Sequence, residues 1–432
     1  MKKINKILLS SALCASFAYG DVATLLPAEK RTFDQSQYVP DISAILDFSF
    51  VNNSVKNDEI GHLELPGIAH GLLGEHTDGD TTHATYNAKQ GFNLNYVEMI
   101  LSSNVDPFLS MDAVFHFSQH GVEIEEAYFT STALGNGLRA RGGKILSNFG
   151  YLNAQHHHYW DFGDMPLVYE AFLGTHGINE LGAQLQWTAP TPFYLMAGFE
   201  VLQGENEMMF GNATIGDVED PIVKGVDAPS LMVGYVKTSF DIGDTTIFGG
   251  VSYAQGSSMV DHSTDEEGPH VFSGDSKLYG ADLVVLHSFN SYSSIKWQSE
   301  WLSREMDGTQ YNLDVNATVP VLALNKKQSG LYSQLIYTHN QNWKMGLRYD
   351  TIYQNDIEKS AGDDSFAPTD LNKYSGMVEY HTSEFARFRL QYNHNDAMYG
   401  EEDDNGVQHK QSVDTIMLQA NIAIGAHSAH SF

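Results

Sequence analysis

The body of this chain alternates apolar and polar residues with a period of two, and it shows almost no helical periodicity. In one segment Phe388, Leu390 and Tyr392 alternate with Arg389 and Gln391. A segment with one apolar and one polar face predicts a β-strand that is buried on a single side. Sixteen such strands are predicted, near residues 41–54, 90–105, 108–118, 121–134, 138–149, 176–189, 193–204, 228–242, 245–256, 277–289, 292–305, 329–339, 342–353, 372–383, 386–397 and 412–432.

Short and long connections alternate strictly between these segments. A soluble β-sandwich has no reason to alternate in this way, whereas an outer-membrane barrel has short periplasmic turns and long outer loops. The sequence therefore predicts an all-β fold, a transmembrane antiparallel up-and-down barrel of about sixteen strands with both termini in the periplasm. The long connections are 55–89, 150–175, 205–227, 257–276, 306–328, 354–371 and 398–411, with one tight connection at 119–120.

The two ends of the chain carry signals of secretion and membrane assembly. Three lysines precede a short apolar run and a small-residue cleavage site, which is typical of a secretory signal peptide over residues 1–20. Residues 21–40 are predicted to form a short periplasmic arm, and 41–432 the barrel. The last strand ends on Phe432, which resembles the signal that barrel-assembly machinery reads. The predicted location is the outer membrane of a Gram-negative bacterium.

Composition excludes several classes of function. The chain has 54 Asp and Glu against 24 Lys and Arg, so a nucleic-acid partner is excluded. Cys14 is the one cysteine and lies in the predicted signal peptide, which excludes a disulfide framework. Most of the acid excess falls in the long connections, on the predicted outer side.

The pattern resembles general porins, in which a long third loop folds into the pore. The matching segment here is YLNAQHHHYWDFGDMPLVYEAFLGT, residues 151–175. The stretches from His176 and Gly330 and the end GAHSAHSF are similar to a group of proteobacterial barrels sometimes labelled zinc-regulated TonB-dependent receptors. This chain is too short to hold their plug. The resemblance implies lipids, lipopolysaccharide and small hydrophilic solutes as partners, and a homotrimer as one possible assembly.

The third-loop segment has acids and no Lys or Arg, while the predicted lumen face of the strands has bases. Acids on the loop opposite bases on the wall would set a transverse field across the constriction. The alternative is that these are ordinary solvated lumen residues. The predicted constriction comprises Asp161, Asp164 and Glu170 of the loop with Arg139, Lys296, Arg348, Arg387 and Arg389 of the wall.

Histidines gather in the first and third outer loops. Imidazole and carboxylate ligands suit Zn²⁺. His156 and His158 point the same way along an extended backbone, and His70 and His76 of the first loop are candidate partners. The alternative is a wet loop in which histidine is tolerated. Acidic runs at 363–364 and 401–404 are candidate Ca²⁺ sites or solvated faces, and no cofactor is expected to be required.

These observations predict a passive outer-membrane channel for small hydrophilic solutes, preferring cations and narrowed by residues 151–175. A channel or receptor for divalent metal such as zinc is the second interpretation, and a non-conducting surface or adhesin barrel is the third. Enzymatic activity is not expected, because no spacing favours a catalytic triad.

Overall fold

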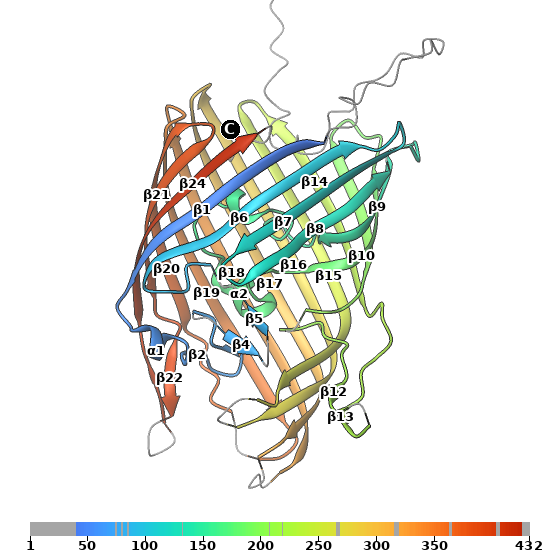
Figure 1. The fold of residues 1–432 in the computed structure, drawn as a ribbon, viewed down its shortest axis with the longest axis vertical. Coiled ribbons are helices and arrows are strands. Elements are labelled where there is room, and N and C mark those ends of the chain that lie inside the picture. The colour runs from blue at the N-terminus through green and yellow to red at the C-terminus, as the bar shows by residue number, and fades with distance from the viewer. Residues whose placement is uncertain are drawn as a thin grey trace, which may run out of the picture.

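Sixteen antiparallel strands close into one barrel, in which the first strand pairs with both the last strand and its successor (Figure 1). The computed structural model describes residues 40–73, 76–78, 81–83, 86–131, 133–206, 208–217, 219–264, 268–314, 319–362, 365–402 and 407–425. The predicted signal peptide and Phe432 lie outside them. The ring order is β1 (Asp41–Asn53), β24 (Val413–Gly425), β21 (Ala386–Asn395), β20 (Leu371–Ser383), β19 (Trp343–Lys359), β18 (Val321–His339), β17 (Ser293–Asn312), β16 (His270–Asn290), β15 (Thr245–His262), β14 (Leu231–Ile242), β11 (Tyr194–Leu202), β10 (Asn179–Thr188), β9 (Leu138–Leu146), β8 (Gly121–Ser131), β7 (Leu109–Ser118) and β6 (Gly91–Asn104).

The outer surface of the barrel is apolar and the inner surface is largely polar, the reverse of a soluble protein. On β24, Leu418 is 52% exposed and Ile424 69% exposed, whereas Gln419 between them is 3% exposed. Only a lipid environment makes an apolar belt of this kind favourable. Because a closed barrel satisfies every strand edge, it can cross the hydrocarbon layer without unpaired backbone groups. The barrel is therefore an outer-membrane barrel, as the sequence predicts.

Five neighbouring strands, β15–β19, are longer than predicted. They contain 17 to 21 residues each, about twice what a bilayer requires. The connections predicted at 257–276 and 306–328 are mostly continuations of these hairpins, and β19 extends into the connection predicted at 354–371 as far as Lys359. Beyond the bilayer both faces of a strand meet water, so the apolar–polar alternation that marks a strand in the sequence fades while backbone pairing continues.

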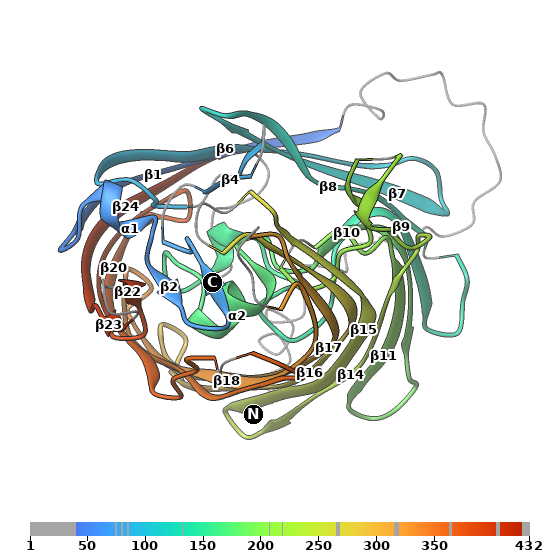
Figure 2. The ribbon, with the colours of Figure 1, turned by 90° about the horizontal axis from the view of Figure 1, so that it is seen from below.

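The interior is not uniformly wet, which corrects the prediction of a water-lined lumen. A helix, α2 (Leu167–Leu173), lies inside the barrel (Figures 1 and 2). All seven of its residues are buried. All of them except Glu170 belong to an apolar cluster that includes inward-facing Leu278 and Leu302 of the wall. The lumen therefore holds a packed core at this level. Among the described residues no helix is long and apolar enough to cross a bilayer.

Outer loops cover part of the mouth on the side away from the termini. The first outer loop contains α1 (Asn57–Ile60), β2 (Glu64–Leu65) and β3 (Ala69–His70), and the last contains β22 (Tyr399–Glu402) and β23 (Gln408–Lys410). These strands form one sheet in the order β23-β22-β2-β3. Seen along the barrel in Figure 2, β2 overlaps α2 within the opening, and Leu65 of β2 belongs to the same apolar cluster as the helix. Two smaller hairpins are β4 (His76–Asp78) with β5 (Thr81–His83), and β12 (Ile215–Gly216) with β13 (Pro221–Val223).

Candidate functional site

The connection between β9 and β10, residues 147–178 and here called the inner loop, folds into the lumen. It contains a short 3₁₀ turn, η2 (His157–Tyr159), and α2. Glu300 on β17 accepts hydrogen bonds from the backbone N–H groups of Tyr151 at 2.7 Å and Leu152 at 3.0 Å. The hydroxyl of Tyr169 also donates to Glu300, at 2.7 Å. One wall carboxylate thus fixes both the start of the inner loop and its helix.

Acids of the inner loop meet bases of the wall directly. A carboxylate oxygen of Asp161 lies 2.6 Å from Lys296 Nζ on β17. Asp164 lies 2.9 Å from Arg348 Nη2 on β19 and 2.5 Å from Lys373 Nζ on β20. Burial opposes ionisation of Asp164, but Arg348 and Lys373 hold its pKa well below the usual range. The predicted field across an open gap is therefore replaced here by closed ion pairs that fasten the loop.

Two further predicted bases bind the backbone of the inner loop. Arg389 Nη2 donates to the carbonyl of Trp160 at 2.8 Å and pairs with Glu379, and Arg387 Nη1 lies 3.4 Å from the same carbonyl. Arg139 does not join them. It lies near the start of β9, at the short-turn end, and donates to Gln186 of β10 at 2.8 Å. Its predicted place in the constriction is wrong, because Arg139 is near the first residue of β9 and the inner loop begins only after the last one.

The wall also positions the helix. Asp350 on β19 accepts a hydrogen bond from the N–H of Leu167, the first residue of α2, at 3.0 Å. Pro166 before the helix has no side chain that can cap it, so the wall supplies the acceptor that a helix start needs. Glu170 in the same helix is 7% exposed, and burial raises its pKa to about 7.

The opposite side of the inner loop carries histidines that face an acidic wall. His156 Nδ1 lies 2.8 Å from Glu125 and His156 Nε2 lies 2.9 Å from Glu126, both on β8. His158 Nδ1 lies 3.1 Å from Glu98 on β6. Burial lowers the pKa of His156, but the two carboxylates outweigh it and raise that pKa well above the usual value. The loop therefore turns acids to a basic wall and histidines to an acidic one.

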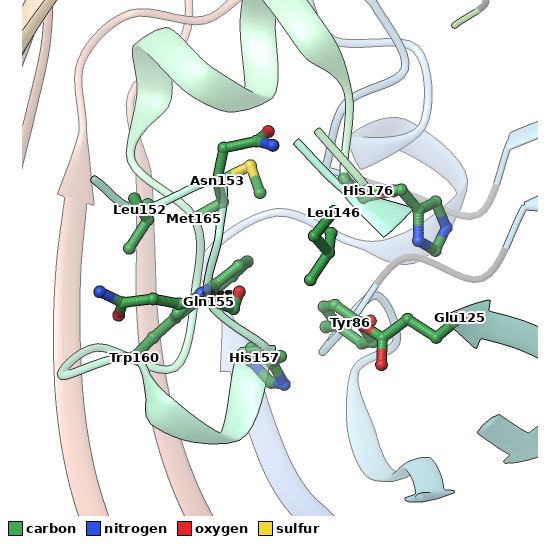
Figure 3. A pocket seen from close by; sticks show the side chains of 11 residues that line it. Tyr86, Glu125, Leu146, Leu152, Asn153, Gln155, His157, Trp160, Met165 and His176 are labelled. Carbon is green, nitrogen blue, oxygen red and sulfur yellow. Dashed lines mark hydrogen bonds between the residues drawn. The ribbon is translucent and has the colours of Figure 1, made fainter. Parts of the chain in front are cut away.

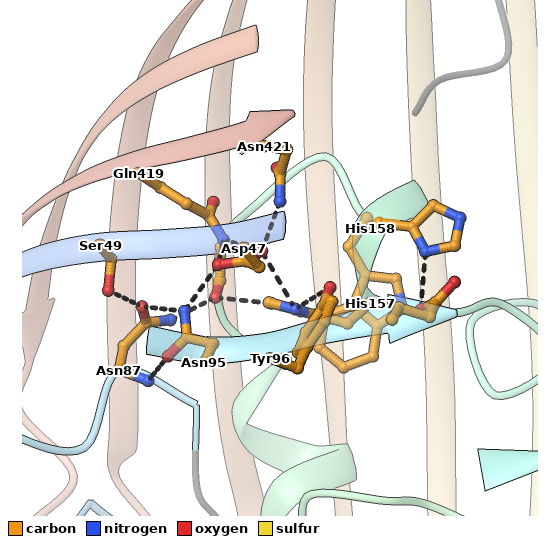
Figure 4. A network of polar contacts seen from close by, with 12 residues as sticks. Asp47, Ser49, Asn87, Asn95, Tyr96, His157, His158, Gln419 and Asn421 are labelled. Atoms are coloured by element: carbon orange, nitrogen blue, oxygen red, sulfur yellow. Dashed lines mark hydrogen bonds and ion pairs between the residues drawn. The ribbon is translucent and has the colours of Figure 1, made fainter. Parts of the chain in front are cut away.

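His157 between them joins a third network, shown in Figure 4. Its Nδ1 lies 3.0 Å from the hydroxyl of Tyr96 and 3.6 Å from Asp47. Its Nε2 lies 3.1 Å from the carbonyl of Gly163 within the loop. Asp47 also accepts hydrogen bonds from Gln419 at 2.8 Å and from Asn421 of the last strand. All three consecutive histidines thus have fixed partners in the structure.

A small pocket lies between the inner loop and β8 (Figure 3). Tyr86, His176 and Glu125 form one side of it, and His157 lies at its edge. Apolar residues of the inner loop, among them Leu152 and Met165, form the other side. The pocket therefore lies next to the side of the inner loop where histidines meet carboxylates.

Two of the predicted metal ligands lie in the first loop. The backbones of His70 and His76 belong to β3 and β4, and their side chains lie outside the described residues. Of the predicted acidic runs, 363–364 lies outside them, and in 401–404 the structure describes only the backbone of 401–402, at the end of β22. Of the predicted metal ligands, the structure therefore places His156 and His158, whose ring centroids are 5.6 Å apart.

Several residues of the site were not predicted from the sequence. Glu98, Glu125 and Glu126 lie 30 to 60 positions away in the sequence from the inner-loop histidines they contact. His116 contacts Glu98 from the neighbouring strand, and one sequence shows no pairing between such positions. One signal was available. Glu125 and Glu126 are consecutive acids inside an alternating strand, where the period must slip if neither is to face lipid.

Comparison with known proteins identifies one sequence relative and many structural ones. No protein-family model matches the chain. An uncharacterized protein of Aquifex aeolicus (strain VF5) is 42% identical over 400 residues, covering 93% of this chain and 81% of that protein. OmpT, an outer-membrane protein of Vibrio cholerae, matches with a TM-score of 0.50 and 12% identity over 89% of this chain and 97% of its own. An anion-selective porin from Comamonas acidovorans has a TM-score of 0.49 and 11% identity, over 89% and 99%. The likeness to the Vibrio cholerae protein shows the fold.

Proposed function

This chain belongs to the same family as the Aquifex aeolicus protein, and from its barrel and inner loop we propose that it is an outer-membrane porin. The observation that carries the proposal is the inner loop itself, held inside a closed sixteen-stranded barrel by polar contacts with opposite walls. Such a loop narrows the aqueous path without needing an energy source. The expected activity is passive diffusion of small hydrophilic solutes, for which the lumen removes the cost of crossing hydrocarbon.

The charge of the interior favours cations. Among the described residues, eleven carboxylates are buried against seven Lys and Arg side chains. The whole chain carries a formal net charge of −30. A passage lined by one sign of charge between low-dielectric walls concentrates the opposite ion. We therefore expect potassium to pass more readily than chloride, although barrels of this fold are found with other preferences.

Planar bilayer recording tests both parts of the proposal. The purified barrel is expected to insert as discrete conductance steps, and a KCl gradient across the membrane should give a reversal potential of the sign set by potassium. A reversal potential set by chloride would contradict the cation preference but not the proposal that the protein is a porin. Absence of steps from protein that migrates as a folded barrel on unheated gels would contradict the porin proposal.

A further inference from the structure

We propose that Glu98, His116, Glu125 and His156, at the contact of the inner loop with β6–β8, bind one divalent transition-metal ion of the Zn²⁺ class. Of these four, Glu98, His116 and Glu125 were not part of the metal-ligand set predicted from the sequence. The four residues come from three neighbouring strands and the loop, so they meet only in the folded barrel. The metal site does not depend on whether the barrel conducts ions, because it requires only that the inner loop is packed against β6–β8.

The four ligand atoms already lie at nearly the mutual distances that a small ion requires. His116 Nε2 lies 3.1 Å from Glu98 Oε2 and 2.9 Å from Glu125 Oε2. His156 Nδ1 lies 2.8 Å from the same oxygen of Glu125. Ligand atoms of Glu98, Glu125 and His156 all fall within 4.8 Å of one another. Zinc bonds of about 2.0–2.2 Å place tetrahedral neighbours roughly 3.3–3.5 Å apart, so only small movements are needed.

Two buried atoms at this cluster have no hydrogen-bond partner among the described residues. Glu98 is fully buried and its Oε1 is unpaired, and His158, also fully buried, leaves Nε2 unpaired. Burying a polar atom without a partner is costly, and such exceptions often mark an ion or a reactive site. A cation beside Glu98 would satisfy the free carboxylate oxygen. His158, whose Nδ1 lies 3.1 Å from Glu98, is a further potential ligand beside the four proposed ones.

Two β-bulges aim side chains into this sector. In the β7–β8 pair, Val114 opposes Glu126 and Phe115 opposes Ile124, which leaves Glu125 as the extra residue. Glu125 and Glu126 are consequently both buried on the inner side. Strict alternation would turn one of them to lipid. A bulge interrupts the ladder and is often found where a side chain must be re-aimed.

The second bulge lies on β6. Asp47 opposes Tyr96 and Phe48 opposes Leu94, so Asn95 is the extra residue. Tyr96 then turns inward and stacks on His116, with centroids 4.4 Å apart and rings nearly parallel. This stacking fixes the His116 ring in the plane from which its Nε2 faces both carboxylates.

The charge of the cluster and the contact behind His156 also favour a metal ion. The ion pairs of Glu98, Glu125 and Glu126 among the described residues are with histidines. A divalent ion can supply the positive charge these buried carboxylates need. With His156 Nδ1 on the metal, its Nε2–H would donate to Glu126, now 2.9 Å away. A carboxylate behind a metal-bound histidine is the usual arrangement. Mixed imidazole and carboxylate ligands suit Zn²⁺ or Co²⁺ better than Ca²⁺ or Mg²⁺.

Metal titration of the intact barrel tests this site. Protein stripped with EDTA is titrated with ZnCl₂ by calorimetry and with CoCl₂ by visible absorption. We expect one ion per barrel and a cobalt spectrum of four-coordinate geometry. The double variant His116→Ala, His156→Ala should weaken binding by at least about tenfold. The matched control His287→Ala, His339→Ala removes two histidines outside the inner loop and should leave the titration unchanged.

Unsaturable binding, or equal affinity in the His116/His156 double variant, would overturn the site. Each variant must first show heat-modifiable migration on gels, which reports a folded barrel. If the double variant does not fold, Glu98→Gln keeps the side-chain volume and removes the charge, and it must show the same loss. Conductance without metal binding would contradict the metal site and not the porin proposal. Metal binding without conductance would contradict the porin proposal and not the metal site.

Discussion

At the scale of residues, the sequence located the inner loop and part of its charged contacts, and missed the rest for one physical reason. Asp161 and Asp164 were identifiable because they are acids in a segment without bases. Their partners Lys296 and Arg348 followed from facing the lumen. Nothing local marks Glu98 as a contact of His158, since that contact joins positions 60 residues apart in the sequence. The roles of the predicted constriction residues in conduction stay predictions.

Glu170 gives a pH dependence at this scale. Its pKa in the seated helix is about 7, above the ordinary 4.5, so the folded state favours the neutral acid. Its contribution to stability is full below about pH 4.5 and is lost as pH rises through about 7. The free energy of unfolding falls by about 3 kcal/mol in total, at about 1.4 kcal/mol for each unit of pKa difference. Thermal unfolding in detergent between pH 5 and 8 should show a falling midpoint that is flatter in Glu170→Gln. Equal slopes in both proteins would contradict this.

At the scale of elements, period-two alternation predicted every barrel strand but not every strand end. The outer part of β18 contains Lys326 and Lys327 in succession and carries no membrane signal. The helix α2 was also missed. It is short and buried on every side, so it lacks the one-sided apolar stripe that reveals a helix in a sequence. Its start depends on Asp350, which belongs to a different strand.

The inner loop as an element should come loose when its ion pairs are broken. Asp164→Asn removes the acid that pairs with buried Lys373 and leaves Arg348 with Asp350 alone. Breaking a buried ion pair in this way typically costs about 3–5 kcal/mol. Hydrogen exchange of peptides from the inner loop should then rise strongly, and single-channel current should become noisier. Asp370→Asn removes an exposed acid that lies 3.3 Å from Lys410 and serves as the control, because surface pairs contribute little. Unchanged exchange in Asp164→Asn would show that the clamp does not hold the loop.

At the scale of the whole molecule, the fold class followed from the sequence, whereas the contents of the barrel did not. A wall strand shows which face is apolar, but the apolar core around Leu167 and Leu302 depends on where the inner loop packs. Connection lengths predicted that a loop enters the barrel. They contain no information on how much of the lumen it fills.

The overall acid excess predicts that selectivity depends on salt. The Debye length falls from about 10 Å at 0.1 M to about 3 Å at 1 M, so charges that do not line the narrowest path lose their influence. The permeability ratio of potassium to chloride, from reversal potentials at fixed gradient, should therefore fall as KCl rises over this range. A ratio independent of salt would place selectivity in the short-range contacts of the inner loop instead.

The tall hairpins β15–β19 also set the surface at the end of the barrel away from the termini, which the sequence predicts to face outward. On that side of the mouth the surface is built from hydrogen-bonded ladders up to 21 residues long. An antibody or a bacteriophage arriving there meets a fixed backbone shape. Recognition of such a shape survives exchange of single side chains and is lost when the chain is denatured. We therefore expect a binder of this rim to recognise the paired backbone more than any single side chain.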